Sequence, residues 1–348
     1  MGEGFHRRAG GPHAEINALA GLGKRAAGAT MYVTLEPCCH TGRTAPCTTA
    51  LIAAGIARVV VGVRDPNPLV NGRGIAQLRR AGIRVDVACL EDQCRELNRP
   101  FFTWVRRRRP LVTLKVAATL DGFIADRVPR KSGARVWITG RAARAAAHVL
   151  RSEHDAILVG AGTVLADDPR LTVRVTGSKA PRAMKTAKPG TAPPPFLRVI
   201  LDGKLRVPRT AAVLPRATGA RTLVVGAVGA PASRAAALRR VGADVVLLPA
   251  RNGRIALGRV LRELANRGIQ SLLVEGGGEV HAAFIHSGLV DRIAFFYAPR
   301  LLGGGVPIAG SVAAAGVIGR KVARALALET VTVRHLRSDL LIRADVRR

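Results

Sequence analysis

The sequence has 348 residues, which is enough for two domains of ordinary size, and 48% of them are hydrophobic. This apolar fraction excludes a disordered chain, and no apolar run reaches the length of a membrane span. The formal net charge of +32 favours anionic partners, but no recognition motif accompanies it, so nucleic acid is not the expected partner.

Residues 13–90 alternate between helix-like and strand-like patterns, which predicts a layered α/β sheet with crossover connections. The expected helices are 13–26, 47–55 and 72–82, and the expected strands are 30–35, 58–63 and 84–90. The stretch 91–110 breaks this rhythm and ends in four arginines followed by Pro110. We interpret this stretch as the connection between two domains, 1–105 and 106–348.

A second alternating series starts at residue 111 and predicts another α/β domain. Its expected strands are 111–117, 156–159, 198–201, 222–225, 245–248, 271–274 and 292–297, with a last β-rich region at 330–342. Its expected helices are 141–151, 232–240, 257–267 and 279–286. Residues 176–196 are rich in Lys, Ala, Thr and Pro and predict a surface loop.

The strongest chemical signal is a set of metal-ligand residues in the first domain. His13, Cys38 and Cys47 offer Zn²⁺ one imidazole and two thiolates, which leaves the fourth tetrahedral position for water. Zinc lowers the pKa of such a water to roughly 7. Glu15 follows the histidine by two residues and is placed to carry protons. This His-x-Glu and Pro-Cys arrangement is the signature of zinc deaminases.

Other interpretations of these residues remain open. A structural zinc site needs a fourth ligand, which Cys39 or His40 could supply, and simple packing of buried cysteines needs no metal. Adjacent cysteines rarely bind one ion well, so we interpret Cys39 as a bystander. Deaminases of cytidine or of adenosine in transfer RNA use Cys-x-x-Cys, whereas eight residues separate Cys38 from Cys47 here. That spacing argues against a nucleic-acid base deaminase.

The cysteines also indicate a cellular compartment. Three of the five cysteines lie within ten residues beside His, Pro and Glu, a pattern typical of a metal site and not of a disulfide framework. The N-terminal residues carry no apolar stretch, so no secretory signal is expected. The sequence therefore predicts a cytoplasmic protein.

The expanded loop PCCHTGRTAPC, residues 37–47, resembles that of the bifunctional deaminase/reductases of riboflavin biosynthesis. Further similar segments are GPHAE (11–15), YVTLEP (32–37), DPNP (65–68), TLKVAATLDG (113–122), WITG (137–140), DAILVG (155–160), TVLADDPRLTVR (163–174) and VEGG (274–277). The resemblance covers nearly the whole chain except 176–196 and the far C-terminus. It implies a cytidine-deaminase-like domain followed by a dihydrofolate-reductase-like domain.

The resemblance also implies a function. The expected reactions are zinc-dependent deamination of 2,5-diamino-6-ribosylamino-4(3H)-pyrimidinone 5′-phosphate and NADPH-dependent reduction to 5-amino-6-(5-phosphoribitylamino)uracil. The residues implied to contact NADPH are Ala118, Trp137, Thr163, Asp167, Gly277, Gly278, Glu279, Val280, His281, Ala282 and Ala283. The residues implied to contact substrate are Arg151, Leu171, Arg174 and Glu275.

The residue chemistry of the second domain is compatible with this function but less specific. The glycine-rich turn at 275–279 suits a phosphate, yet it lacks the Gly-x-Gly-x-x-Gly spacing and could be a tight turn. Arg151 and Arg174 suit bidentate phosphate binding, although an arginine in so basic a chain is often a solvated surface charge. Lys115 and Asp121 are candidate proton donors that the sequence cannot rank.

Two alternatives concern the whole chain. The resemblance implies a further helix and two strands ahead of Gly4, and their loss would expose a sheet edge and remove part of the pyrimidine pocket. The first alternative is therefore a chain that retains the zinc ligands but whose deamination is weak or absent, which would leave a reductase-only chain. The non-enzymatic alternative is a basic RNA-binding protein with a structural zinc. A homo-oligomer is left open.

Overall fold

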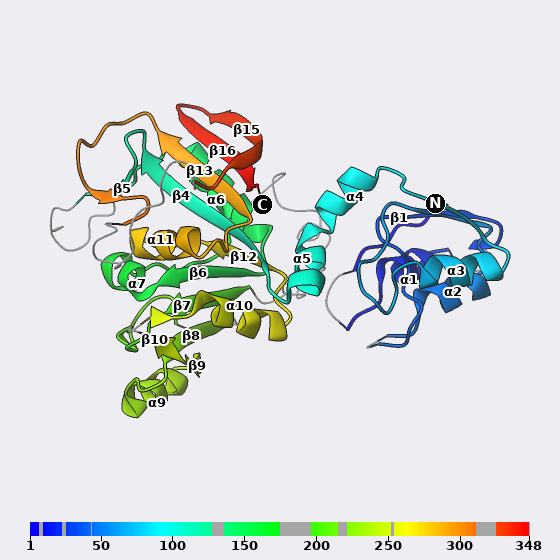
Figure 1. The fold of residues 1–348 in the computed structure, drawn as a ribbon, viewed down its shortest axis with the longest axis horizontal. Coiled ribbons are helices and arrows are strands. Elements are labelled where there is room, and N and C mark those ends of the chain that lie inside the picture. The colour runs from blue at the N-terminus through cyan, green and yellow to red at the C-terminus, as the bar shows by residue number, and fades with distance from the viewer. Residues whose placement is uncertain are drawn as a thin grey trace. The chain divides into compact units, whose positions relative to one another are not determined.

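The computed structural model describes residues 1–6, 10–22, 26–42, 44–126, 136–174, 196–214, 221–251, 254–310 and 325–347. The chain divides into two compact units, Met1–Arg109 and Pro110–Arg348 (Figure 1). Within these described ranges, no helix is both long enough and apolar enough to cross a membrane. The loop expected at 176–196 lies outside the described residues except for Phe196.

The first unit contains a parallel three-stranded sheet in the order β1-β2-β3. The strands are β1 Thr30–Val33, β2 Arg58–Val61 and β3 Arg84–Val87, and the helices packed on them are α1 Ala14–Ala20, α2 Cys47–Ala53 and α3 Arg73–Arg80. Leu51 of α2, Val59 of β2 and Leu78 of α3 are fully buried in its apolar core. The alternation of helices and strands was predicted correctly, although α1 ends at Ala20 and not at residue 26.

Two helices occupy the stretch that was interpreted as a connection. They are α4, Glu91–Leu97, and α5, Arg99–Arg107. Acidic residues in the first turn of α4 and basic residues in the last turn of α5 match the helix dipole, and Pro100 suits the first turn of α5. Phe102 is the one buried residue of α5, and α4 has none. The two helices therefore leave too weak a pattern of apolar residues to be recognised in the sequence.

The second unit is built on a nine-stranded sheet in the order β15-β16-β13-β4-β12-β6-β7-β8-β9. Its strands are β4 Leu111–Thr119, β6 Ala156–Gly160, β7 Leu197–Leu201, β8 Thr222–Ala227, β9 Asp244–Leu248, β12 Ser271–Val274, β13 Arg292–Ala298, β15 Leu328–Leu336 and β16 Asp339–Val346. Two small ribbons pair β5 Phe123–Ala125 with β14 Val306–Pro307, and β10 Ala250–Arg251 with β11 Arg254–Ile255. Within the described residues, β16 pairs antiparallel with both β13 and β15, and all other strand pairs of the large sheet are parallel.

Helices cover both faces of this sheet. The helices are α6 Arg141–Ser152, α7 Ala161–Asp167, α9 Ala232–Arg240, α10 Leu257–Asn266 and α11 Gly278–His286. In β6, Leu158 packs in the cluster that contains α10 and α11, whereas Ile157 and Val159 pack in the cluster that contains α7 and α9. Because both faces are buried, the central strands are continuous apolar runs, which is why they were recognisable in the sequence.

The parallel strands bring their carboxyl ends to one edge. Val274, the last residue of β12, lies opposite Leu114 of β4 and Leu158 of β6. Glu275 follows at the end of β12 and donates its backbone N–H to the Leu158 carbonyl. In parallel α/β sheets ligands bind outside the carboxyl ends of the strands, so this edge is the expected place for a site.

Candidate active sites

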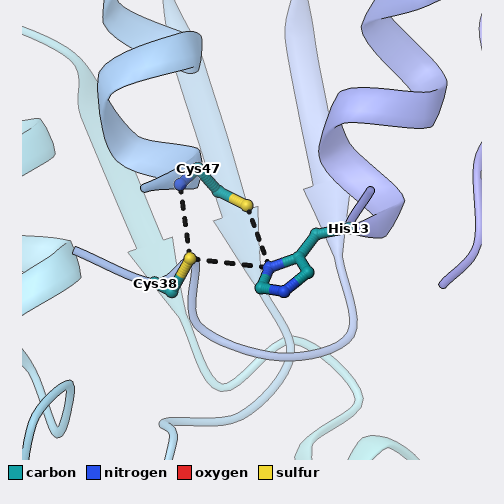
Figure 2. Close-up of side chains that lie close together, drawn as sticks. All are labelled: His13, Cys38 and Cys47. Carbon is teal, nitrogen blue, oxygen red and sulfur yellow. Dashed lines mark hydrogen bonds between the residues drawn. The ribbon is translucent and has the colours of Figure 1, made fainter. Parts of the chain in front are cut away.

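Three ligand-type side chains of the first unit converge on one point (Figure 2). The ligand atoms of His13, Cys38 and Cys47 all lie within 4.8 Å of one another. His13 Nδ1 is 3.5 Å from Cys38 Sγ and 3.3 Å from Cys47 Sγ. His13 immediately precedes α1, Cys38 lies in the loop after β1, and Cys47 begins α2. The fold thus brings together residues that are 34 positions apart.

The electrostatics of this cluster suit metal-binding thiolates. The Cys47 thiol and backbone N–H both donate to Cys38 Sγ, which lowers the pKa of Cys38 to about 5. The same contact, together with burial, raises the pKa of Cys47. Burial also raises the pKa of Glu15, against the opposing charge of His13. Glu15 is 9% exposed and interacts with the Cys47 side chain, so a carboxyl group lies beside the ligand cluster.

Backbone contacts hold the Cys38 loop in place. The hydroxyl and backbone N–H of Thr48 both donate to the Cys38 carbonyl, at 3.2 and 3.1 Å. The buried Glu36 carboxylate accepts backbone N–H groups from Asp65, Gly72 and Ile75, at 3.3, 2.9 and 3.2 Å. Glu36 therefore ties the end of β1 to the start of α3, and its role is structural.

Helix α3 packs closely against this loop, which explains one glycine. A Cβ atom added to Gly74 would lie 2.1 Å from the Pro37 carbonyl oxygen. A side chain at this position would push on the residue next to Cys38, so only glycine fits there.

The second ring nitrogen of His13 has its own partner. His13 Nε2 is 3.3 Å from Thr44 Oγ1, while Nδ1 faces the two sulfur atoms. If Nδ1 carries a metal, Nε2 carries the hydrogen and donates it to Thr44. Such a contact fixes the orientation and tautomer of a ligating histidine.

We expect Thr44→Val to lower zinc affinity by roughly 10–100-fold without unfolding the first unit, because only the orienting hydrogen bond is lost. Zinc affinity is measured by competition with a chromophoric chelator. Thr44→Ser, which keeps the hydroxyl, is the matched control. Equal affinities of Thr44→Val and the parent protein would exclude this role for Thr44.

The cluster opens into a cavity of about 310 Å³. Its lining residues are Gly10, His13, Cys38, His40, Gly42, Thr44 and Trp104. His40 Nδ1 is buried and has no hydrogen-bond partner within the described ranges. The lining role of Trp104 was missed in the sequence because α5 was not predicted. One imidazole and two thiols beside a cavity form the kind of ligand set that holds a catalytic zinc, so these residues fit that ion.

Glu275 is a buried carboxylate of the second unit that pairs with two basic side chains. Its side chain is 7% exposed, and its two oxygens accept Arg151 Nε and Nη2 at 2.7 and 2.8 Å. Lys115 Nζ is 3.6 Å from Oε2. The charges of Lys115 and Arg151 outweigh burial and lower the pKa of Glu275 to about 2. Arg151 thus meets the predicted substrate residue Glu275 directly.

Lys115 is a residue that sequence reasoning mentioned but could not rank. It is the single charged residue inside the apolar run 111–117, and this was the available signal. Asp121, the other candidate, is exposed and accepts backbone N–H groups from Leu302 and Gly303, at 2.9 and 2.7 Å. These bonds and the Thr119 hydroxyl, the largest cause, lower the pKa of Asp121. Of the two candidates, Lys115 is the one that contacts the buried Glu275 carboxylate.

The glycine turn precedes α11 and has free donors. Gly277 is the N-cap of α11, and the backbone N–H groups of Gly278 and Glu279 meet no acceptor in the described part of the chain. A Cβ on Gly277 would lie 3.4 Å from Thr163 Oγ1, so Thr163 borders the turn. Free N–H groups at a helix N-terminus suit the phosphates of a dinucleotide, so this turn fits NADPH.

The remaining predicted cofactor residues differ in their surroundings. Ala118 is buried in β4 opposite Tyr297. The predicted residues of α11 divide into the buried His281 and Ala282, the half-buried Val280 and the exposed Glu279 and Ala283. Trp137 and Asp167 are exposed, and the described residues show no hydrogen bond from either one to the glycine turn.

The predicted substrate residues Leu171 and Arg174 lie beyond α7. Leu171 is buried with a φ of 47°, which turns the chain sharply after the helix. Arg174 is exposed, and its guanidinium and backbone N–H both contact His148 of α6.

Known proteins match both units. The model of the cytidine and deoxycytidylate deaminase zinc-binding region matches residues 1–63, and the model of the RibD C-terminal domain matches residues 110–342. The chain is 42% identical to riboflavin biosynthesis protein RibD of Aquifex aeolicus over 344 residues, which cover 98% of this chain and 87% of that protein. The chain belongs to the RibD family.

Other RibD proteins and their structures agree with this assignment. The RibD of Escherichia coli is 39% identical over 306 residues, which cover 87% of this chain and 79% of that protein. RibD of Acinetobacter baumannii superimposes with a TM-score of 0.80 at 35% identity, covering 100% of this chain and 89% of that one. A diaminohydroxyphosphoribosylaminopyrimidine deaminase/5-amino-6-(5-phosphoribosylamino)uracil reductase from Thermotoga maritima gives 0.78 at 34% identity, covering 99% and 88%.

Membership of the RibD family confirms several predictions made from the sequence. The chain is an enzyme of riboflavin biosynthesis with a deaminase region and a reductase region, and its cofactors are Zn²⁺ and NADPH. The predicted fold class, a deaminase-like α/β domain followed by a reductase domain, is confirmed.

Proposed function

We propose that this chain deaminates 2,5-diamino-6-ribosylamino-4(3H)-pyrimidinone 5′-phosphate in its first unit. In the second unit it then reduces the ribosyl side chain of the product to give 5-amino-6-(5-phosphoribitylamino)uracil. The observation that carries the proposal is the convergence of one imidazole and two thiols at a cavity beside a buried carboxyl group. The name of the Thermotoga relative, which contains both activities, supports the pairing of the two steps.

In the deaminase unit, His13, Cys38 and Cys47 hold the metal, and Glu15 carries protons. Zinc held by these residues would supply a water that is acidic enough to attack at neutral pH. The Glu15 carboxylate takes a proton from this water and passes it to the ring nitrogen or the departing amine of the pyrimidine. Thr44 orients His13, and Thr48 and Glu36 keep the Cys38 loop in place.

In the reductase unit, the chain positions two ligands across the carboxyl edge of the sheet. NADPH supplies the hydride. The N–H groups of Gly278 and Glu279, with Thr163 beside them, bind the cofactor phosphates. Lys115 Nζ, held by Glu275, donates the proton that the open-chain ribosylamine needs when its imine carbon is reduced. Arg151 keeps Glu275 ionised and oriented.

We also place the protein in the cytoplasm. All five cysteines are free, and the proposed site uses two of them as thiolates. A reducing compartment keeps such thiols available for zinc.

Metal removal tests the two halves separately. We expect a chelator to abolish ammonia release from the diaminopyrimidine substrate, with recovery on adding Zn²⁺. NADPH oxidation with the deaminated substrate, followed by absorbance, should be unchanged. Ammonia release that survives removal of the metal would contradict the zinc mechanism, and absence of substrate-dependent NADPH decay would contradict the reductase mechanism.

A further inference from the structure

A large aromatic side chain lines the cavity beside the zinc-ligand cluster. Trp104 of helix α5 borders this cavity together with the ligand residues His13 and Cys38. Helix α5 belongs to the first unit, so the cavity is built within one compact part of the chain. The indole of Trp104 has a hydrogen-bond donor and no acceptor, so it neither binds a metal nor takes up a proton. What it adds to the cavity is a broad, flat, mostly apolar surface.

Contacts at the start of α5 fix the place of the Trp104 ring. Asn98, the N-cap of α5, donates its side-chain N–H to the Thr34 carbonyl at 3.3 Å, which ties the helix to the residue after β1. Phe102 buries its side chain in the first unit. Phe101 precedes Trp104 by three residues, and the two rings stack with centroids 6.4 Å apart and planes at 26°. The indole is therefore supported by its own helix.

The geometry of deamination leaves one face of the substrate ring without a partner. A nucleophile adds to a trigonal ring carbon from above or below the ring plane. The attacking water lies on the side of His13, Cys38 and Cys47, so one face of the pyrimidine is turned towards these residues. The opposite face points away from them, and an aromatic side chain is the partner that suits a flat ring.

We propose that Trp104 stacks on the pyrimidine ring of the deaminase substrate, on the face turned away from the metal ligands. This inference rests on the proposed deaminase function, and it names a residue that sets the preference of the site for flat rings. The other residues that line the cavity are glycine, threonine, histidine and cysteine, which offer smaller or more polar surfaces.

Tryptophan fluorescence tests the contact without catalysis. The chain has two tryptophans, so Trp137→Phe leaves Trp104 as the only one. Glu15→Gln is added to slow deamination, and the zinc-loaded protein is titrated with the diaminopyrimidine substrate. We expect the substrate to quench the emission of Trp104 to a saturating level, whereas ribose 5-phosphate, which lacks the ring, should leave it unchanged. Constant emission at substrate concentrations far above the KM for ammonia release would overturn the proposal.

The kinetics of ammonia release test the same contact in the active protein. Trp104→Leu keeps an apolar side chain but loses the aromatic face, so KM should rise roughly 5–150-fold, the range for loss of one stacked base. The change in kcat should be smaller, because stacking acts on the substrate and on the transition state alike. Trp104→Phe should restore most of the loss.

The matched control is Tyr32→Leu, which removes a ring that is 70% exposed on β1 and is not among the lining residues of the cavity. This variant should keep the KM of the parent protein. Unfolding curves and elemental analysis establish that each variant is folded and holds its zinc.

Two kinetic results would also overturn the proposal. One is a parent-like KM of Trp104→Leu, and the other is a folded Trp104→Phe protein whose KM is no lower than that of Trp104→Leu. Failure of the deaminase function has a different signature. In that case the parent protein, loaded with zinc, would release no ammonia from the diaminopyrimidine substrate.

Discussion

Replacing Glu15 with glutamine is expected to slow ammonia release by roughly 10²–10⁴-fold while zinc remains bound. Glutamine has nearly the same shape as glutamate but cannot take a proton from the attacking water. The three metal ligands are other residues, so the zinc content measured by elemental analysis should equal that of the parent protein. NADPH oxidation in the second unit should be unaffected.

The matched control for this variant is Glu91→Gln on helix α4, where the glutamate pairs with Arg95 on the surface. This change should leave ammonia release as it is. If Glu15→Gln lost its zinc together with its activity, Glu15 would be a structural residue of the site. If it kept both, another group would be the proton carrier.

Replacing Glu275 with glutamine is expected to have the largest effect on the second unit. The change leaves Lys115 and Arg151, whose side chains are 15% and 16% exposed, without their counter-charge. Breaking a buried ion pair by removing one partner costs about 3–5 kcal/mol. We expect the free energy of unfolding of this unit to fall by that amount and NADPH oxidation to be lost. Urea denaturation followed by circular dichroism measures the first effect.

The control is Glu263→Gln, which removes a partly exposed carboxylate of α10 that pairs with Arg267 at the C-terminal end of the helix. Surface pairs contribute about 0–1 kcal/mol, so this variant should unfold almost as the parent does. If the free energy of unfolding fell by similar amounts in the two variants, the buried ion pairs of Glu275 would contribute no more to stability than a surface pair.

The same residue predicts a pH dependence. The pKa of Glu275 is about 2 in the folded protein, below its ordinary value of 4.5. Because the folded pKa is the lower one, the stabilisation is fully present above pH 4.5 and is lost as the pH falls towards 2. The stability difference between the parent and Glu275→Gln should therefore shrink over this interval. A difference that stays constant down to pH 2 would contradict the assignment.

Much of this protein follows from local sequence patterns. Strands such as 156–159 and 271–274 are buried on both faces, and short apolar runs between turns identify them without knowledge of their neighbours. The His13, Cys38 and Cys47 cluster was recognisable because one histidine and two cysteines at this spacing, with a glutamate beside them, are typical of a catalytic zinc site. Helices α4, α5 and α7 were missed, since each buries at most two side chains and leaves only a weak periodic signal.

The long-range contacts were decided by the tertiary structure alone. That Arg151 binds Glu275, 124 positions away, follows from the parallel order of β4, β12 and β6 and from the packing of α6 on the sheet. Likewise, only the fold brings His148 beside Arg174 and Trp104 to the zinc cavity. The sequence of one segment shows the spacing of its apolar residues and the chemistry of its side chains. The distance between residues of different segments depends on how those segments pack together, and no single segment encodes that packing.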